Sequence, residues 1–245
     1  FVNRIAHRDQ ASLSDAPSNE QLPQLLGISI RSESMRKLHH KVHLIAAQAS
    51  NTPVLIQGET GTGKGVIAHA IHQLGPRKLK PFIEVNCSAL PVGLTEGLLF
   101  GHESGAFTDA KEARAGYFET AHQGILFLDE VAELPLDAQA KLLKVLEEQR
   151  FCRLGGSTPV EVNVMVIAAT HQNLAQLVER GRFREDLFYR LQVLELHVPP
   201  LRERRQDIPP LAQAFFEKAC QQSGKSIQAM DTAMLQWLGN YEFPG

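Results

Sequence analysis

A glycine-rich segment at residues 58–65 carries the clearest chemical signal in the sequence. It reads Gly-Glu-Thr-Gly-Thr-Gly-Lys-Gly and contains the spacing G-x-x-x-x-G-K, which ends at Lys64. Glycines let successive backbone N–H groups point inward around an anion, and a helix that follows adds its positive N-terminus. The segment is therefore typical of a phosphate-binding loop in which Lys64 reaches the β- and γ-phosphates. The alternative is a glycine-rich turn with a solvated lysine, and Gly65 stands where a Ser or Thr usually binds the metal ion.

Two adjacent carboxylates, Asp129 and Glu130, follow the apolar run at residues 125–128. Ligands of an open α/β sheet bind at the C-terminal ends of its strands, where a carboxylate after such a run would lie. We expect Asp129 to bind Mg²⁺, directly or through water, and Glu130 to polarise the water that attacks a phosphate. The alternative is that the pair only ends a strand and caps the next helix. The phosphate-binding loop upstream favours the catalytic interpretation.

Two arginines, Arg184 and Arg190, could supply the positive charge that phosphoryl transfer requires, acting from a neighbouring subunit. Residues six apart on one helix point about 120° away from each other, so an unbroken helix cannot aim both at one phosphate. Either a helix begins between them, or one contacts the nucleotide while the other holds an interface. The alternative is that both form solvated ion pairs with Glu185 and Asp186.

Five short apolar segments, separated by helical patterns, would position these side chains. They lie at residues 53–57, 82–85, 125–128, 164–168 and 193–198. Fully apolar strands that alternate with helices indicate an α/β fold, with a parallel sheet covered by helices on both faces. Apolar residues at helical spacing predict helices after an N-cap at Ser32 or Ser34, around residues 66–71 and over residues 138–148.

Composition divides the chain into three parts. Residues 1–24 are polar and lack apolar periodicity, so we interpret them as a linker from an N-terminal regulatory domain. Residues 25–200 form the α/β core. Residues 201–245 contain only helical patterns, which we expect to begin after the break at Pro209-Pro210 and to bury Trp237 in a small core.

The charge balance and the cysteines exclude several classes of protein. Lys and Arg total 25 against 27 Asp and Glu, which argues against a basic nucleic-acid surface and against an acidic tail. No apolar run approaches the roughly 20 residues that a membrane-spanning helix needs. The three cysteines are odd in number and lack a C-x-x-C motif, so a disulfide framework or a zinc module is a poor interpretation.

Several motifs in a fixed order make the chain resemble a known family. They are GETGTGKG at 58–65, NCSAL at 86–90, LFGHESGAFTDA at 99–110, LFLDE at 126–130, AATHQNL at 168–174, GRFREDLFYRL at 181–191 and PPLRER at 199–204. Together they resemble the AAA+ central domain of bacterial enhancer-binding proteins, the NtrC-like sigma-54-dependent transcriptional activators. The resemblance implies an AAA+ P-loop NTPase fold with a small helical lid, and a cytoplasmic ATPase with ATP and Mg²⁺ as its ligands.

The resemblance also implies roles for particular residues. Lys64 corresponds to the Walker A lysine, and Asp129 and Glu130 to the Walker B pair. Asn86 matches the residue that switches the Walker B glutamate, and Arg184 and Arg190 match two arginine fingers that act across the subunit interface. These roles make Glu130, Asn86, Arg184 and Arg190 the catalytic set. The implied nucleotide-binding set comprises Gly58, Glu59, Thr60, Gly61, Thr62, Gly63, Lys64, Gly65, Val66 and Asp129, with Thr170 and His171 at the sensor I position.

A loop at residues 105–110 corresponds to the family's contact with sigma-54. Its members are Gly105, Ala106, Phe107, Thr108, Asp109 and Ala110. The resemblance implies a homo-oligomer, hexameric when active and possibly dimeric at rest, that remodels the sigma-54 RNA polymerase holoenzyme so that promoters open. The sequence stops before the family's sensor II arginine, so we expect a truncated lid and DNA binding only through a missing C-terminal helix-turn-helix domain.

The same loop departs from the family pattern. It reads GAFTDA where the family reads GAFTGA, and Ser104 stands where a lysine is common. Asp109 therefore adds negative charge where the family has a glycine, which adopts any backbone φ. An alternative function follows: an ATP-binding regulatory module that controls transcription without remodelling sigma-54. A metabolic P-loop kinase is a poorer interpretation, because no segment resembles an acceptor site.

Overall fold

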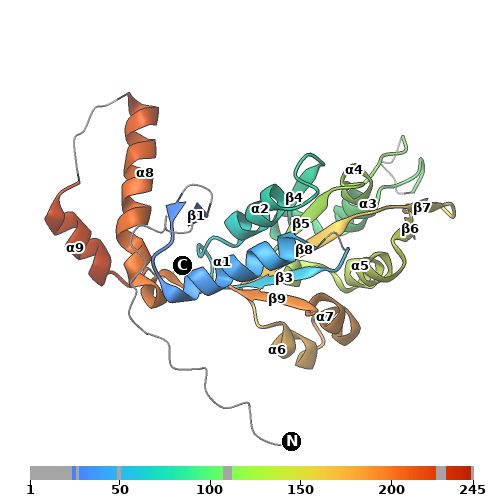
Figure 1. The fold of residues 1–245 in the computed structure, drawn as a ribbon. Helices are drawn as coiled ribbons and strands as arrows, with labels where there is room; N and C mark the ends of the chain where they lie inside the picture. The colour runs from blue at the N-terminus through green and yellow to red at the C-terminus, as the bar shows by residue number, and fades with distance from the viewer. Residues whose placement is uncertain (1–23, 26–27, 49–50, 107–111, 225–229, 244–245) are drawn as a thin grey trace, which may run out of the picture.

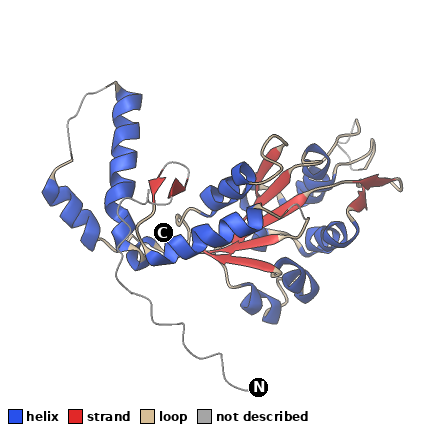
Figure 2. Ribbon diagram, in the orientation of Figure 1, coloured by secondary structure: helices blue, strands red, loops and turns tan. Residues whose placement is uncertain are grey.

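The core of the computed structural model is a parallel sheet of five strands (Figures 1 and 2). The structure describes residues 24–25, 28–48, 51–106, 112–224 and 230–243. The sheet has the order β4-β5-β8-β3-β9, and its members are β3 (Val54–Gln57), β4 (Phe82–Asn86), β5 (Ile125–Asp129), β8 (Met165–Thr170) and β9 (Leu194–His197). All five strands predicted from apolar runs are confirmed, and each pairs in parallel with its neighbours.

Helices α1 (Glu33–Ala46) and α2 (Lys64–Leu74) cover one face of the sheet. Their apolar residues share a core with alternate strand residues such as Ile56, Phe127 and Ile167, which point to this side. Ser32 caps α1 by accepting a hydrogen bond from the Met35 N–H. The predicted cap and the predicted parallel α/β fold are therefore both confirmed.

The opposite face is covered by α5 (Leu136–Glu148) and by shorter helices. These are α3 (Thr95–Phe100), α4 (Tyr117–Thr120), α6 (Leu174–Glu179) and α7 (Glu185–Leu191). The intervening strand residues, among them Leu55, Leu128 and Val166, pack into this second core. The alternation places one apolar layer on each side of the sheet, so the strands are buried on both faces.

A hairpin of β6 (Arg150–Cys152) and β7 (Pro159–Glu161) extends from this core, and the sequence patterns did not predict it. It contacts the segment that leads into the loop at 105–110. His102 exchanges backbone hydrogen bonds with Arg114, while Leu154 donates to the Gly101 carbonyl and accepts from the Glu103 N–H. The loop base and the hairpin are therefore joined by backbone hydrogen bonds.

Helices α8 (Ile208–Ser223) and α9 (Thr232–Asn240) form a lid at the end of the molecule opposite the β6–β7 hairpin (Figure 1). The expected start of the first lid helix was wrong, because Pro209 and Pro210 lie in the first turn of α8. Proline is tolerated there, since the backbone N–H groups of the first turn have no acceptor within the helix. Trp237 was expected in a core but is 62% exposed, and it stacks on Tyr241 at 5.2 Å between ring centroids.

The remaining elements are short. They are strands β1 (Gln24–Leu25) and β2 (Ile28–Ser29), and the 3₁₀ turns Cys87–Ala89, Val92–Leu94, Val131–Glu133, Leu201–Glu203 and Arg205–Asp207. Among the helices of the described residues, none is both long and apolar enough to cross a membrane.

Candidate nucleotide-binding site

The turn between β3 and α2 has the backbone of a phosphate-binding loop. Gly61 and Gly63 have φ values of 77° and 96°, in the left-handed region that favours glycine. A Cβ atom at Gly58 would lie 2.7 Å from the Val198 carbonyl oxygen, so a side chain does not fit there. The Lys64 side chain is 7% exposed and folds back over the loop, where its Nζ donates to the carbonyls of Gly58 at 3.0 Å and Glu59 at 3.3 Å.

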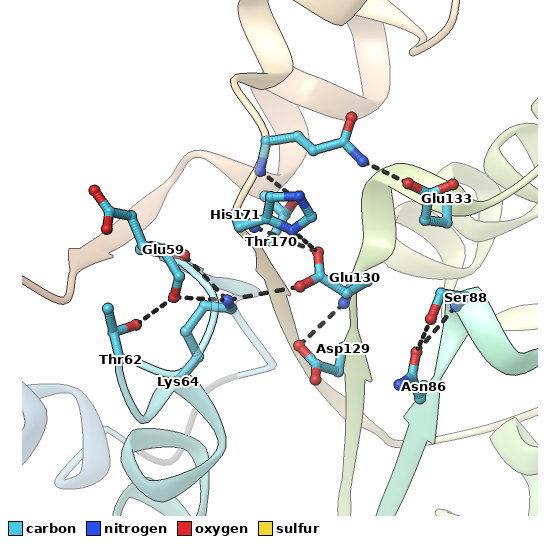
Figure 3. Close-up of polar contacts among 12 residues, drawn as sticks. Glu59, Thr62, Lys64, Asn86, Ser88, Asp129, Glu130, Glu133, Thr170 and His171 are labelled. Carbon is cyan, nitrogen blue, oxygen red and sulfur yellow. Dashed lines mark hydrogen bonds and ion pairs between the residues drawn. The ribbon is translucent and has the colours of Figure 1, made fainter. Parts of the chain in front are cut away.

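The two carboxylates predicted to act on phosphate lie beside this loop (Figure 3). Asp129 ends β5 and accepts a hydrogen bond from the Glu130 N–H at 3.1 Å. Burial and the adjacent charge of Glu130 raise the pKa of the Asp129 carboxyl above its ordinary value. Glu130 itself has φ 53° and ψ 50°, and one of its carboxylate oxygens lies 3.6 Å from Lys64 Nζ.

The two residues predicted at the sensor I position lie at the end of β8 and directly after it, next to the same carboxylate. Thr170 is fully buried, and its hydroxyl accepts from the Gln172 N–H at 3.0 Å. The ring Nδ1 of His171 lies 2.7 Å from Glu130 Oε2. The sequence motif placed His171 near the phosphates but gave no sign that its partner would be Glu130.

Asn86 ends β4 directly opposite Asp129 in the parallel register. Its side-chain oxygen accepts from the Ser88 N–H at 3.0 Å and from the Ser88 hydroxyl at 2.7 Å. Within the part of the chain that the structure describes, Asn86 is therefore bonded to Ser88 and not to Glu130. Its proposed role as the switch for Glu130 stays a prediction.

The structure separates the two candidate arginine fingers. Helix α7 begins between them: Arg184 is its N-cap residue, and Arg190 lies in its last turn. Arg184 makes a bidentate ion pair with Asp186, at 3.0 and 2.7 Å, on the surface. Arg190 turns inward and donates to the Leu146 carbonyl at 2.8 Å. Neither finger contacts the phosphate-binding loop of its own chain among the described residues, so a catalytic role for either requires a second subunit.

A cavity of about 410 Å³ adjoins the phosphate-binding loop, between the core and the lid. Its walls include Met35, Pro200, Leu211, Phe215 and Tyr241, together with loop residues 59–63. A mostly apolar cavity beside an anion-binding loop suits the aromatic faces of a flat base that is linked to phosphates.

Two arginines that precede the lid helices contact residues of the phosphate-binding loop beside this cavity. No role was predicted for either of them from the sequence. Arg202 makes a bidentate ion pair with Glu59, at 2.7 and 2.5 Å. Arg204 donates to the Thr62 carbonyl at 2.8 Å. Both lie in the PPLRER motif, which is the signal that could have identified them. The two arginines therefore connect residues 202–204, which lead into the lid, to the phosphate-binding loop.

The loop assigned to sigma-54 contact is described only at its edges. Gly105 has φ 81°, and a Cβ atom at Gly155 would lie 2.9 Å from that of Ala106. Phe107, Thr108, Asp109 and Ala110 lie outside the described residues. At the loop base, Arg153 of the hairpin pairs with Glu119 at 2.7 Å and with Glu103 at 3.2 Å.

The fold and the site together define a P-loop NTPase domain with a helical lid. Residues 28–197 match the model of the sigma-54 interaction domain family, and residues 202–245 match the AAA+ ATPase lid domain. The chain belongs to the sigma-54 interaction domain family.

Named relatives agree with this assignment. The chain is 50% identical over 230 residues to the DNA-binding transcriptional activator HyfR of Escherichia coli, and this match covers 93% of this chain and 34% of HyfR. It is 45% identical over 245 residues to the anaerobic nitric oxide reductase transcription regulator NorR of Aeromonas salmonicida, covering 100% of this chain and 47% of NorR. The crystal structure of NtrX from Brucella abortus in complex with ATP superimposes with a TM-score of 0.82 at 36% identity, over 92% of this chain and 48% of NtrX. The chain thus spans half or less of these relatives.

Proposed function

We propose that this domain binds and hydrolyses ATP and, as a ring of identical subunits, uses that hydrolysis to remodel the sigma-54 RNA polymerase holoenzyme in the cytoplasm. The observation that carries the proposal is the meeting of Lys64, at the start of α2, with Asp129 and Glu130, at the end of β5 and directly after it, on one edge of the sheet beside the glycine-rich loop. Membership of the sigma-54 interaction domain family supports the choice of partner. Because the chain spans only part of its relatives, DNA binding would belong to a further domain.

The residues of the site divide the work of phosphoryl transfer. Backbone N–H groups of the loop and the N-terminus of α2 would bind the phosphates, with Lys64 as the cation. The apolar cavity would hold the base. Glu130 would orient and polarise the attacking water, a general-base role that contributes about 10²- to 10⁴-fold. Arg184 or Arg190 of a neighbouring subunit would stabilise the charge that develops on the transferred group.

The donor set suits Mg²⁺. Asp129 offers carboxylate oxygens near the Lys64 ammonium. Burial, and after it the charge of Glu130, raises the pKa of the Asp129 carboxyl, and a divalent cation bound there would favour its ionised form. Gly65 supplies no hydroxyl to the ion. A Cβ atom there would lie 3.8 Å from the Phe127 ring, which is an ordinary contact, so the fold does not require glycine at this position. Asp129 would therefore hold the ion, directly or through water, and the ion would neutralise charge on the phosphate oxygens.

Hydrolysis is tested by phosphate release from Mg²⁺-ATP by the wild-type chain, Glu130→Ala and Glu133→Ala. Glu133 is a matched control, because it lies three residues further on and its carboxylate faces Gln172. We expect Glu130→Ala to lose at least about 100-fold in rate and Glu133→Ala to stay near wild type. If wild type hydrolyses ATP no faster than Glu130→Ala, the ATPase proposal fails.

The second candidate, an ATP-dependent switch that does not act on sigma-54, is favoured by Asp109 in the partner loop and by Gly65 in the phosphate-binding loop. It is separated from the first by measuring sigma-54 capture with ADP and aluminium fluoride, in wild type and in Asp109→Gly. Capture by both supports remodelling of sigma-54. Normal hydrolysis with capture by Asp109→Gly alone leaves the ATPase proposal standing and refutes the sigma-54 partnership.

A further inference from the structure

The Glu130 carboxylate lies between two positively polarised groups (Figure 3). Its Oε1 is 3.6 Å from Lys64 Nζ, and its Oε2 is 2.7 Å from His171 Nδ1. The His171 backbone N–H points to the same Oε2 at 3.4 Å. An ionised carboxylate only accepts hydrogen bonds, so the short contact requires the His171 proton on Nδ1. The Glu130 side chain is 15% exposed, which shields it from competing water.

The position of this carboxylate matters because Lys64 is the cation of the phosphate-binding loop. Lys64 is itself buried, and its ammonium faces two backbone carbonyls and Glu130. Glu130 therefore supplies the negative charge that a terminal phosphate would otherwise supply. Two anions compete for one buried ammonium, so binding of a phosphate there requires Glu130 to yield.

His171 is the side chain that keeps Glu130 in this position. Asn86, the other neighbour expected to control Glu130, is bonded to Ser88 instead. The backbone of Glu130 is in the left-handed region, and from this backbone conformation its carboxylate extends toward Lys64. The imidazole of His171 fixes the far oxygen, leaving the near oxygen facing the ammonium.

We propose that His171 is a positioning residue that holds Glu130 against Lys64 when no nucleotide is bound, so that the general base occupies the phosphate subsite as an internal competitor. The proposal rests on the proposed function and adds a regulation to its site. A nucleotide with a terminal phosphate that reaches Lys64 must displace the carboxylate, and the general base is freed in the same step. We expect this competition to weaken triphosphate binding more than diphosphate binding, because the phosphate-binding loop predicts that Lys64 reaches the β- and γ-phosphates and only a triphosphate has both.

The competition predicts that removing a side chain from the binding site raises the affinity for nucleotide. His171→Ala leaves Glu130 free to turn away from Lys64, so ATPγS binds more tightly by about two- to five-fold, the effect of losing a competing ion pair that contributes up to about 1 kcal/mol. Glu130→Gln removes the competing charge and tightens ATPγS binding similarly, while the double variant gains nothing further over Glu130→Gln. The effect on ADP is smaller. His171→Gln retains an N–H donor that reaches the same oxygen and restores affinity toward wild type.

The test is a calorimetric titration of ATPγS and ADP with Mg²⁺ into the whole chain, which requires no turnover. His40→Ala serves as the matched control, because His40 is exposed on α1, away from the loop. If His171 acts only by sensing the phosphate, His171→Ala weakens ATPγS binding; that result, or an unchanged affinity, overturns the proposal. A double variant whose gain in affinity is the sum of the two single gains also overturns it. If wild type binds neither nucleotide, the proposed function fails with it, a result distinct from binding that His171→Ala does not tighten.

Discussion

The buried carboxylate of Asp207 offers a sharp test of how the lid is attached to the core. Asp207 is 3% exposed and accepts three hydrogen bonds from the start of α1. The Arg31 and Ser32 N–H groups donate to its Oδ1 at 2.6 and 2.8 Å, and the Ser32 hydroxyl donates to its Oδ2 at 2.5 Å. One side chain thus joins the two residues that precede α1 to the N-cap position of α8.

Replacing Asp207 by alanine leaves these donors buried without an acceptor. A hydrogen bond to a charged group contributes about 1.5–3 kcal/mol, and a buried donor left without a partner costs about 1–3 kcal/mol. For the three donors together, we expect Asp207→Ala to lower the free energy of unfolding by about 3–5 kcal/mol. In a chain of this size that corresponds to a loss of roughly 10 °C in Tm. Asp207→Asn keeps one acceptor and supplies a donor for the Ser32 hydroxyl, so it should cost about 1–2 kcal/mol.

Urea unfolding followed by circular dichroism measures these differences, and Asp137→Ala is the control, since Asp137 is exposed in the first turn of α5. The expected order of stability is wild type and Asp137→Ala, then Asp207→Asn, then Asp207→Ala. An Asp207→Ala protein within about 1 kcal/mol of wild type would refute the reasoning, because it would show that water or a backbone shift satisfies the donors.

Two further predictions concern the sheet. A Cβ atom at Gly124 would overlap the Pro81 carbonyl, so Gly124→Ala should cost about 3 kcal/mol in the same unfolding assay. Gly93→Ala, with no atom within 4 Å of the new Cβ, should cost far less; equal losses would contradict the packing argument. Burial, with the nearby charge of Asp129, raises the pKa of the Cys87 thiol to about 12, so only about one molecule in ten thousand carries the reactive thiolate at pH 8. Mass spectrometry after iodoacetamide treatment should find Cys87 unmodified in folded protein and modified in urea; labelling of folded protein at the unfolded rate would show the opposite.

The parallel sheet could be predicted because each of its strands has a recognisable local sequence pattern. Runs such as residues 125–128 are apolar throughout, as a strand buried on both faces must be. The meeting of Lys64 with Asp129 and Glu130 was also predictable, since parallel strands bring their C-terminal ends to one edge. Local periodicity together with one topological rule therefore accounts for the centre of the site.

The contacts that could not be predicted join residues far apart in the chain. Arg202 pairs with Glu59 across 143 residues, and Asp207 bonds to Ser32 across 175. No periodicity or motif spacing encodes such pairs, because they depend on where the lid is set against the core. The exposure of Trp237 was missed for a related reason: residue type predicts burial only where enough neighbouring structure exists to cover the side chain.

The left-handed backbone of Glu130 has a consequence for protein engineering. A non-glycine residue in that conformation costs about 1–3 kcal/mol, and glycine adopts it without strain. Glu130→Gly would therefore remove strain at the same time as it removes the carboxylate beside Lys64. Selection for thermal stability alone would then favour loss of the side chain to which the proposed function assigns the general-base role, so stabilised variants of this domain need to be chosen with position 130 held fixed.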